Sequence, residues 1–123
     1  MSIVINWRET RLLEDGCGGS IYKVVDTDNS ALIDLEMAMC TFAPSEVSMR
    51  HHHNRIEEIY FFLEGDAEIR IDETWKTVGS DDAVAIPRGV SHQIRNKSPT
   101  NNLRFLSVNS PRWLSEDMII DPA

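Results

Sequence analysis

The chain has 123 residues, of which 41% are hydrophobic and 26% are charged, and its formal net charge at pH 7 is −8. These values are ordinary for one globular domain, and an acidic chain with scattered Lys and Arg does not suit a nucleic-acid backbone. No apolar run approaches the ~20 residues that span a bilayer, and the first residues do not have the pattern of a signal peptide. We therefore expect a single cytoplasmic domain over residues 1–123, with free Cys17 and Cys40 and without a nucleic-acid or membrane partner.

The first part of the chain gives mixed signals. Residues 1–19 have the character of an irregular or edge segment that ends in a glycine-rich turn. Residues 20–26 are rich in β-forming side chains. Residues 31–42 have the composition of a helix, but alternation of side chains within them favours a strand.

The rest of the chain alternates short β segments with turns. The predicted strands cover residues 47–53, 56–64, 67–71, 75–78, 83–86, 92–96 and 103–109. Many short strands with regularly spaced turns indicate an all-β sandwich or barrel. Proline and cap-like Ser and Asp residues within residues 110–117 predict a short helical turn before a frayed end.

Three of the four histidines stand together in the run from His51 to His53. Because side chains alternate across a strand, His51 and His53 face the same way, roughly 6.6 Å apart, and His52 faces the other way. Two imidazoles at this spacing can bind one metal ion, with each nitrogen about 2.0–2.1 Å from it. The spacing therefore predicts half of a metal site.

Further ligands come from two later segments. A turn at residues 54–55 reverses the chain, so the next strand returns a carboxylate, either Glu57 or Glu58, toward the histidines. Both faces of this strand are apolar, so side-chain parity does not choose between the two. His92 opens a later strand directly after a Pro-x-Gly turn. An ion held by three imidazoles and one carboxylate would keep two octahedral positions open for a ligand.

These two segments are similar to the two sequence motifs of the cupins. The first motif, His-x-His, four residues, Glu, six residues and Gly, is matched without a gap from His51 to Gly65. The second, Gly, five residues, Pro-x-Gly, two residues, His, three residues and Asn, is matched from Pro87 to Asn96. Its opening glycine is replaced by Asp81, which we interpret as a changed turn and not as a lost site.

The resemblance implies an all-β double-stranded β-helix, the RmlC-like jelly-roll or cupin barrel, with the motifs in residues 47–109. It also implies one divalent metal ion, Fe, Mn, Ni or Zn, and it selects Glu58 over Glu57. The implied ligands are His51, His53, Glu58 and His92.

Similar small cupins include dioxygenases, isomerases, lyases and decarboxylases. We therefore expect a metal-dependent enzyme that acts on a small, oxygen-rich organic acid or sugar derivative. The alternatives are a non-catalytic module that binds a small ligand and a closed structural zinc site. Tyr60 and Gln93 are candidates for polar contacts at the site.

Two further expectations concern packing. Met37 and Met39 are expected to line the barrel together with aromatic side chains. Small cupins are commonly dimers, and the apolar residues 3–7 are suited to extending a neighbour's sheet, so we expect a homodimer.

Overall fold

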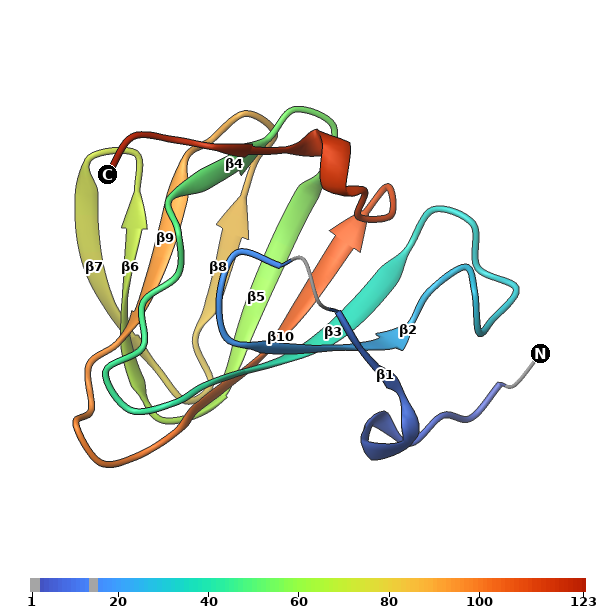
Figure 1. Ribbon diagram of the computed structural model, residues 1–123, viewed down its shortest axis with the longest axis horizontal. Coiled ribbons are helices and arrows are strands. Elements are labelled where there is room, and N and C mark those ends of the chain that lie inside the picture. Colours follow the sequence, from blue (N-terminus) through green and yellow to red (C-terminus); the bar gives the residue numbers. More distant parts are fainter. Residues whose placement is uncertain (1–2, 14–15) are drawn as a thin grey trace.

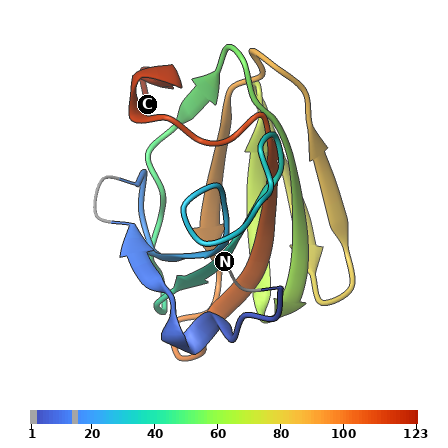
Figure 2. The ribbon, with the colours of Figure 1, turned by 90° about the vertical axis from the view of Figure 1, so that its right-hand side faces the viewer.

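The computed structural model describes residues 3–13 and 16–123, which form two facing antiparallel sheets (Figures 1 and 2). One sheet has the strand order β1-β2-β3-β10-β5-β8 and the other has the order β11-β4-β9-β6-β7. The predicted all-β jelly roll is confirmed. The strands are β1 (Arg11–Leu13), β2 (Ser20–Val25), β3 (Glu36–Phe42), β4 (His51–His53), β5 (Glu57–Glu64), β6 (Asp66–Ile71), β7 (Thr74–Gly79), β8 (Ala83–Ile86), β9 (His92–Asn96), β10 (Leu103–Ser110) and β11 (Met118–Ile120).

Most predicted strands agree with the structure within a residue at each end. The segments 83–86 and 92–96 are confirmed residue for residue as β8 and β9. The ambiguous segment 31–42 does contain a strand, but β3 begins only at Glu36.

The predicted strand over residues 47–53 is wrong in its first half, because β4 begins at His51. Ser48 interrupts the pairing with β9: its amide donates to the Ile94 carbonyl (2.9 Å), while its hydroxyl accepts from the Ile94 amide (3.0 Å). A side chain thus takes the place of a backbone acceptor. Val47 forms only an isolated bridge with Arg95.

The two ends of the chain add edge strands to the sheets. β1 lies at the edge of the six-stranded sheet. The predicted helical turn is a 3-10 turn at Ser115–Asp117, but the frayed end is wrong, since β11 follows it and pairs with β4. A three-residue strand is too short to carry a periodic signal.

The described N-terminal residues contain a 3-10 turn, η1, at Trp7–Glu9. Ile3 and Val4, expected to extend a neighbour's sheet, are 98% and 90% exposed. The homodimer stays a prediction. Within residues 3–13 and 16–123, neither helical turn has the length or apolar character needed to cross a membrane.

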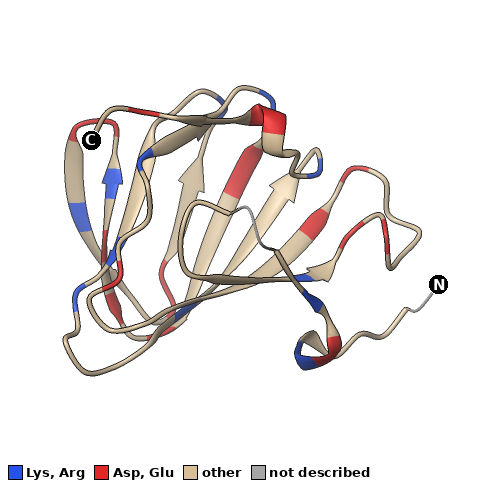
Figure 3. Cartoon of the chain, viewed as in Figure 1, with Lys and Arg blue, Asp and Glu red and all other residues tan. Residues whose placement is uncertain are grey.

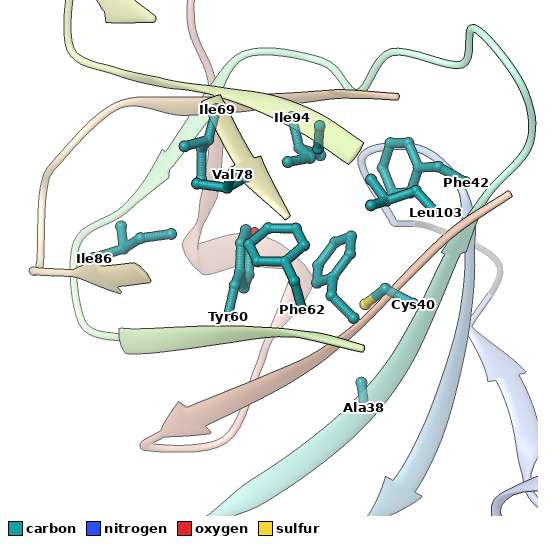
Figure 4. Packing of buried hydrophobic residues seen from close by; sticks show 12 residues of the cluster. Ala38, Cys40, Phe42, Tyr60, Phe62, Ile69, Val78, Ile86, Ile94 and Leu103 are labelled. Carbon is teal, nitrogen blue, oxygen red and sulfur yellow. The ribbon is translucent and has the colours of Figure 1, made fainter. Parts of the chain in front are cut away.

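Apolar side chains fill much of the space between the sheets (Figure 4). Phe62 and Leu103 are fully buried, and Phe42 and Phe105 are 2% exposed. The interior face of β3 carries Ala38, Cys40 and Phe42. The expectation for Met37 and Met39 is therefore wrong: they alternate with these residues and belong to the other face of β3, where Met39 is buried and Met37 is partly buried.

Two turns explain how the motifs keep their shape. Gly65 has φ +94°, and a Cβ there would lie 2.8 Å from the Asn102 carbonyl oxygen, so glycine is required. Asp81, which replaces the glycine that opens the second motif, has φ +75°. Aspartate tolerates this left-handed region better than most residues do. The turn conformation is therefore retained with a different side chain.

Candidate metal centre

The side chains of His51, His53, Glu58 and His92 meet inside the barrel. Their potential ligand atoms all lie within 4.8 Å of one another, and all four residues are buried. β4 supplies the first two histidines, and β5 and β9 supply the other residues near their starts. His51 is the register partner of His92 across β4 and β9. The structure thus brings together the four residues that the motifs select.

Strand parity explains why the other members of the run are excluded. His52 faces away from the cluster, and its Nδ1 lies 2.9 Å from an Asp121 carboxylate oxygen. Glu57 is exposed and has an ion-pair contact of 3.7 Å with Arg88. Glu58 is only 6% exposed and pairs in register with Asn109 of β10. The pairing of β5 with β10 therefore places Glu58, and not Glu57, on the interior face. Side-chain alternation in the sequence alone did not decide between them.

Backbone carbonyls orient two of the imidazoles. His51 Nδ1 lies 3.0 Å from the Met49 carbonyl oxygen, and His92 Nδ1 lies 3.0 Å from that of Val90. A carbonyl only accepts, so each Nδ1 carries the proton and donates it. In this tautomer each Nε2 atom has a free lone pair, and this is the form of imidazole that binds a metal.

Unpaired polar atoms in the cluster provide the test of whether it fits a cation. Glu58 Oε1 and His92 Nε2 are 3.1 Å apart. Both atoms are buried, and neither has a hydrogen-bond partner among the described residues. A carboxylate oxygen and an imidazole lone pair that face each other repel, and a cation between them removes this repulsion. Three imidazoles and one carboxylate are also a common donor set for Zn, Fe, Ni and Mn. The residues fit a divalent ion.

The charge states of the side chains in the cluster suit the binding of a cation. Burial lowers the pKa of His51 to about 4, and His92 lowers it further. Burial also lowers the pKa of His53. Although burial opposes ionisation of Glu58, its interactions with the neighbouring histidines leave its pKa below the ordinary value. Near neutral pH His51 and His53 are thus neutral and the glutamate is charged, as metal binding requires.

A chain of polar contacts connects Glu58 to Lys23. The Ser107 hydroxyl lies 3.3 Å from Glu58 Oε2 and 3.2 Å from Asn109 Oδ1. The Asn109 amide donates to Glu36 Oε1 (3.2 Å), and Lys23 donates to Glu36 Oε2 (2.7 Å). All five side chains are buried. The two glutamates of this series of contacts belong to the acidic segments at the starts of β5 and β3, which are red in Figure 3.

The cluster borders a small cavity of about 50 Å³. Tyr60, one of the two predicted polar contacts, lines the cavity, and its ring lies 6.0 Å from that of His92. Burial and then Glu58 raise the Tyr60 pKa, so its hydroxyl stays protonated. Gln93, the other predicted contact, is not brought to the cluster: it alternates with His92 and donates to the Ser48 carbonyl.

Cys17, for which the sequence indicates no role, lies in the wall of the cavity. Its Sγ is 3.6 Å from His51 Nε2. Burial, followed by the charge of Glu58, raises the pKa of the thiol to about 12. The glycine-rich turn around Cys17 was visible in the sequence, but its packing against β4 was not.

Comparison with known protein families decides the affiliation of the chain. The profile of the cupin domain matches residues 38–109, more than half of the sequence. The chain belongs to the cupin family. Among curated proteins, this cupin is 31% identical over 81 residues to mannose-1-phosphate guanylyltransferase of Escherichia coli (strain K12). The match covers 65% of the cupin but only 16% of the relative's length.

Solved structures resemble this cupin along almost its whole length. The polyketide cyclase RemF of Streptomyces resistomycificus matches with a TM-score of 0.75 and 20% identity, covering 95% of this cupin and 89% of RemF. The Streptomyces nucleoside dehydratase Pac13 matches with a TM-score of 0.80 and 8% identity, covering 98% of this cupin and 92% of Pac13. At these identities the likeness establishes the fold alone.

Proposed function

We propose that this cupin is a metal-dependent enzyme for a small, oxygen-rich organic acid or sugar derivative. The observation that carries the proposal is the buried cluster of His51, His53, Glu58 and His92, in which Glu58 Oε1 and His92 Nε2 have no hydrogen-bond partner among the described residues. Buried polar atoms are costly when unpaired. Their persistence beside a cavity favours a site that a cation completes.

The four side chains are the proposed ligands. A bound Fe, Mn, Ni or Zn ion would supply Lewis-acid polarisation of a substrate oxygen or, for iron, a site for O₂. The Met49 and Val90 carbonyls keep His51 and His92 in the ligating tautomer. Ser107 holds one oxygen of Glu58, which leaves the other free to face the cation.

The cavity wall is suited to a small molecule with an apolar part and several oxygens. Ile94 and Phe105 contribute apolar surface, while Asn109 and Lys23 contribute hydrogen-bond donors. A few polar groups in an apolar pocket commonly orient a ligand. Because Lys23 is paired with Glu36, the pair can bind a polar substrate group without adding net charge.

Tyr60 is the proposed proton donor or hydrogen-bond donor to the substrate. Its raised pKa keeps the hydroxyl protonated, which suits a donor and not a general base. Its position in the same wall as His53 and Glu58 places it beside the proposed reaction centre. Gln93 has no part in the proposal, because its amide is engaged on the opposite face of β9.

Two structural neighbours are named for enzymatic reactions, one as a polyketide cyclase and the other as a nucleoside dehydratase. These names support an enzyme over a passive binding module. They do not transfer a substrate. The proposal includes dioxygenase-, isomerase- and lyase-type reactions and does not choose among them. It also includes a cytoplasmic location.

Metal analysis tests the site directly. Untagged protein should contain close to one divalent metal ion per chain, and the double substitution His51→Ala, His53→Ala should abolish binding. His52→Ala is the matched control, since this neighbouring ring faces away and contacts Asp121. Equal metal content in the double variant and the wild type would refute the ligand assignment.

Activity screens of metal-exchanged protein test the chemistry. Turnover that needs Fe(II) and O₂ would identify a dioxygenase, whereas turnover without oxygen would identify an isomerase or lyase. Tight binding of a small acid without turnover under any metal would instead identify a binding module. Tyr60→Phe should lower the turnover rate more than it weakens substrate binding.

A further inference from the structure

The loop Gly16–Gly19 is fixed against the segment that leads into β4. The Met49 amide donates to the Cys17 carbonyl (2.8 Å), and the Gly19 amide donates to Glu46 Oε2 (3.0 Å). Gly18 has φ +143°, and a Cβ there would lie 2.9 Å from the Ser48 Cα. This close approach holds the loop beside the barrel interior.

The packing of the loop places the Cys17 thiol beside His51 of the cluster. Its Sγ lies 3.6 Å from Nε2 of His51, the nitrogen that the Met49 carbonyl leaves free for a metal. Cys17 therefore lies at the edge of the cluster, beside His51, and the unpaired Glu58 Oε1 and His92 Nε2 independently indicate a cation within the cluster.

The distance suits two ligands of one ion. With metal–sulfur and metal–nitrogen bonds of about 2.3 Å and about 2.0–2.1 Å, two donors are about 3.1 Å apart at a right angle and about 3.5 Å apart at the tetrahedral angle. The observed 3.6 Å is close to this range. We propose that Cys17 is a fifth protein ligand of the metal centre, an inference that rests on the proposed function.

A thiolate ligand would change what the centre can do. The charges of Glu58 and Cys17 together would balance a divalent ion, and an octahedral ion would keep one open position in place of two. Sulfur ligation also favours zinc and iron over manganese and magnesium, which prefer oxygen ligands. The substrate would then bind through a single oxygen.

Cobalt spectroscopy tests the proposal with Co(II) alone as the probe. The Co(II)-loaded protein should show a near-ultraviolet thiolate-to-cobalt charge-transfer band in addition to the visible cobalt bands. Cys17→Ser should lose the charge-transfer band while still binding Co(II). Cys40→Ser is the matched control: this buried cysteine lies on β3 in the apolar cluster, so its replacement should keep the band.

The outcomes separate the two proposals. Stoichiometric Co(II) binding without a charge-transfer band, or a band that persists in Cys17→Ser, would overturn the fifth ligand and leave the four-ligand site intact. A protein that binds no Co(II) would overturn both proposals. As a second measurement, bound metal should protect Cys17 from alkylation by iodoacetamide, and unchanged alkylation would contradict ligation.

Discussion

The two ends of the barrel interior are built on the same strands but differ in chemistry. On β5 the inward positions change from Glu58 through Tyr60 to Phe62. On β10, which pairs with β5, the change is from Asn109 and Ser107 to Phe105 and Leu103. The antiparallel register places polar side chains of β10 beside polar ones of β5, and apolar beside apolar, so one end of the interior is polar and the other is apolar. The apolar end thus supports the stability of the fold, and the polar end carries the proposed metal site.

The largest expected effect comes from opening the apolar end. Phe62→Ala should lower the free energy of unfolding by about 3–5 kcal/mol, because it removes a fully buried ring that packs 5.1 Å from the Phe105 ring. Urea denaturation measures this loss. Phe61→Ala, its neighbour on the opposite face of β5, should cost clearly less. Loss of metal binding in folded Phe62→Ala protein would break the proposed separation of the ends.

The polar end should give the metal-free protein a pH-dependent stability. The unfolded His51 binds a proton below a pH of about 6.5, whereas the folded residue does so only below about 4. The free energy of unfolding should therefore fall as the pH is lowered from about 6.5 to about 4, by at most about 1.4 kcal/mol per pH unit from this residue.

Urea denaturation of the metal-free protein across this pH range measures the slope. His51→Gln should flatten it, because glutamine does not titrate. The Phe62→Ala variant should keep the slope of the wild type at a lower overall stability. If His51→Gln left the slope unchanged, the titrating group would lie elsewhere in the chain.

The smallest expected effect concerns the contact that orients Glu58. Ser107→Ala removes the hydroxyl beside Glu58 Oε2 and should weaken metal affinity by about 10-fold, as loss of an outer-shell partner typically does. Metal-competition titration with a chelator measures the change. Ser80→Ala, at an exposed turn, is the control. An unchanged affinity would show that the polar chain is structural only.

The site residues could be predicted from the sequence where a single motif covers two consecutive strands and the turn between them. His51 and His53 share a face by parity, and the turn before Glu58 returns the carboxylate, so these residues were identifiable without coordinates. The bounds of β8 and β9 were also predictable, because turn residues flank both strands. Parity could not separate Glu57 from Glu58, since apolar residues occupy both faces of β5.

Other features depend on pairings between distant segments, which the sequence does not display. Glu36 meets Asn109 only through the register of β3 with β10. Cys17 reaches His51 because the segment Gly16–Gly19, which precedes β2, packs against the residues that lead into β4. The same limitation misplaced Met37 and Met39, because apolar residues occupy both faces of β3 and its interior face is set by the neighbouring strands.

The carbonyls of Met49 and Val90 have a wider consequence, since main-chain atoms fix the orientation of two imidazoles. Side chains around the cavity can be exchanged without altering which nitrogen these rings present. A scaffold of this kind can acquire a new specificity while its inorganic chemistry stays constant. Redesign for another reaction should therefore begin with the cavity wall and leave the main-chain path before β4 and β9 untouched.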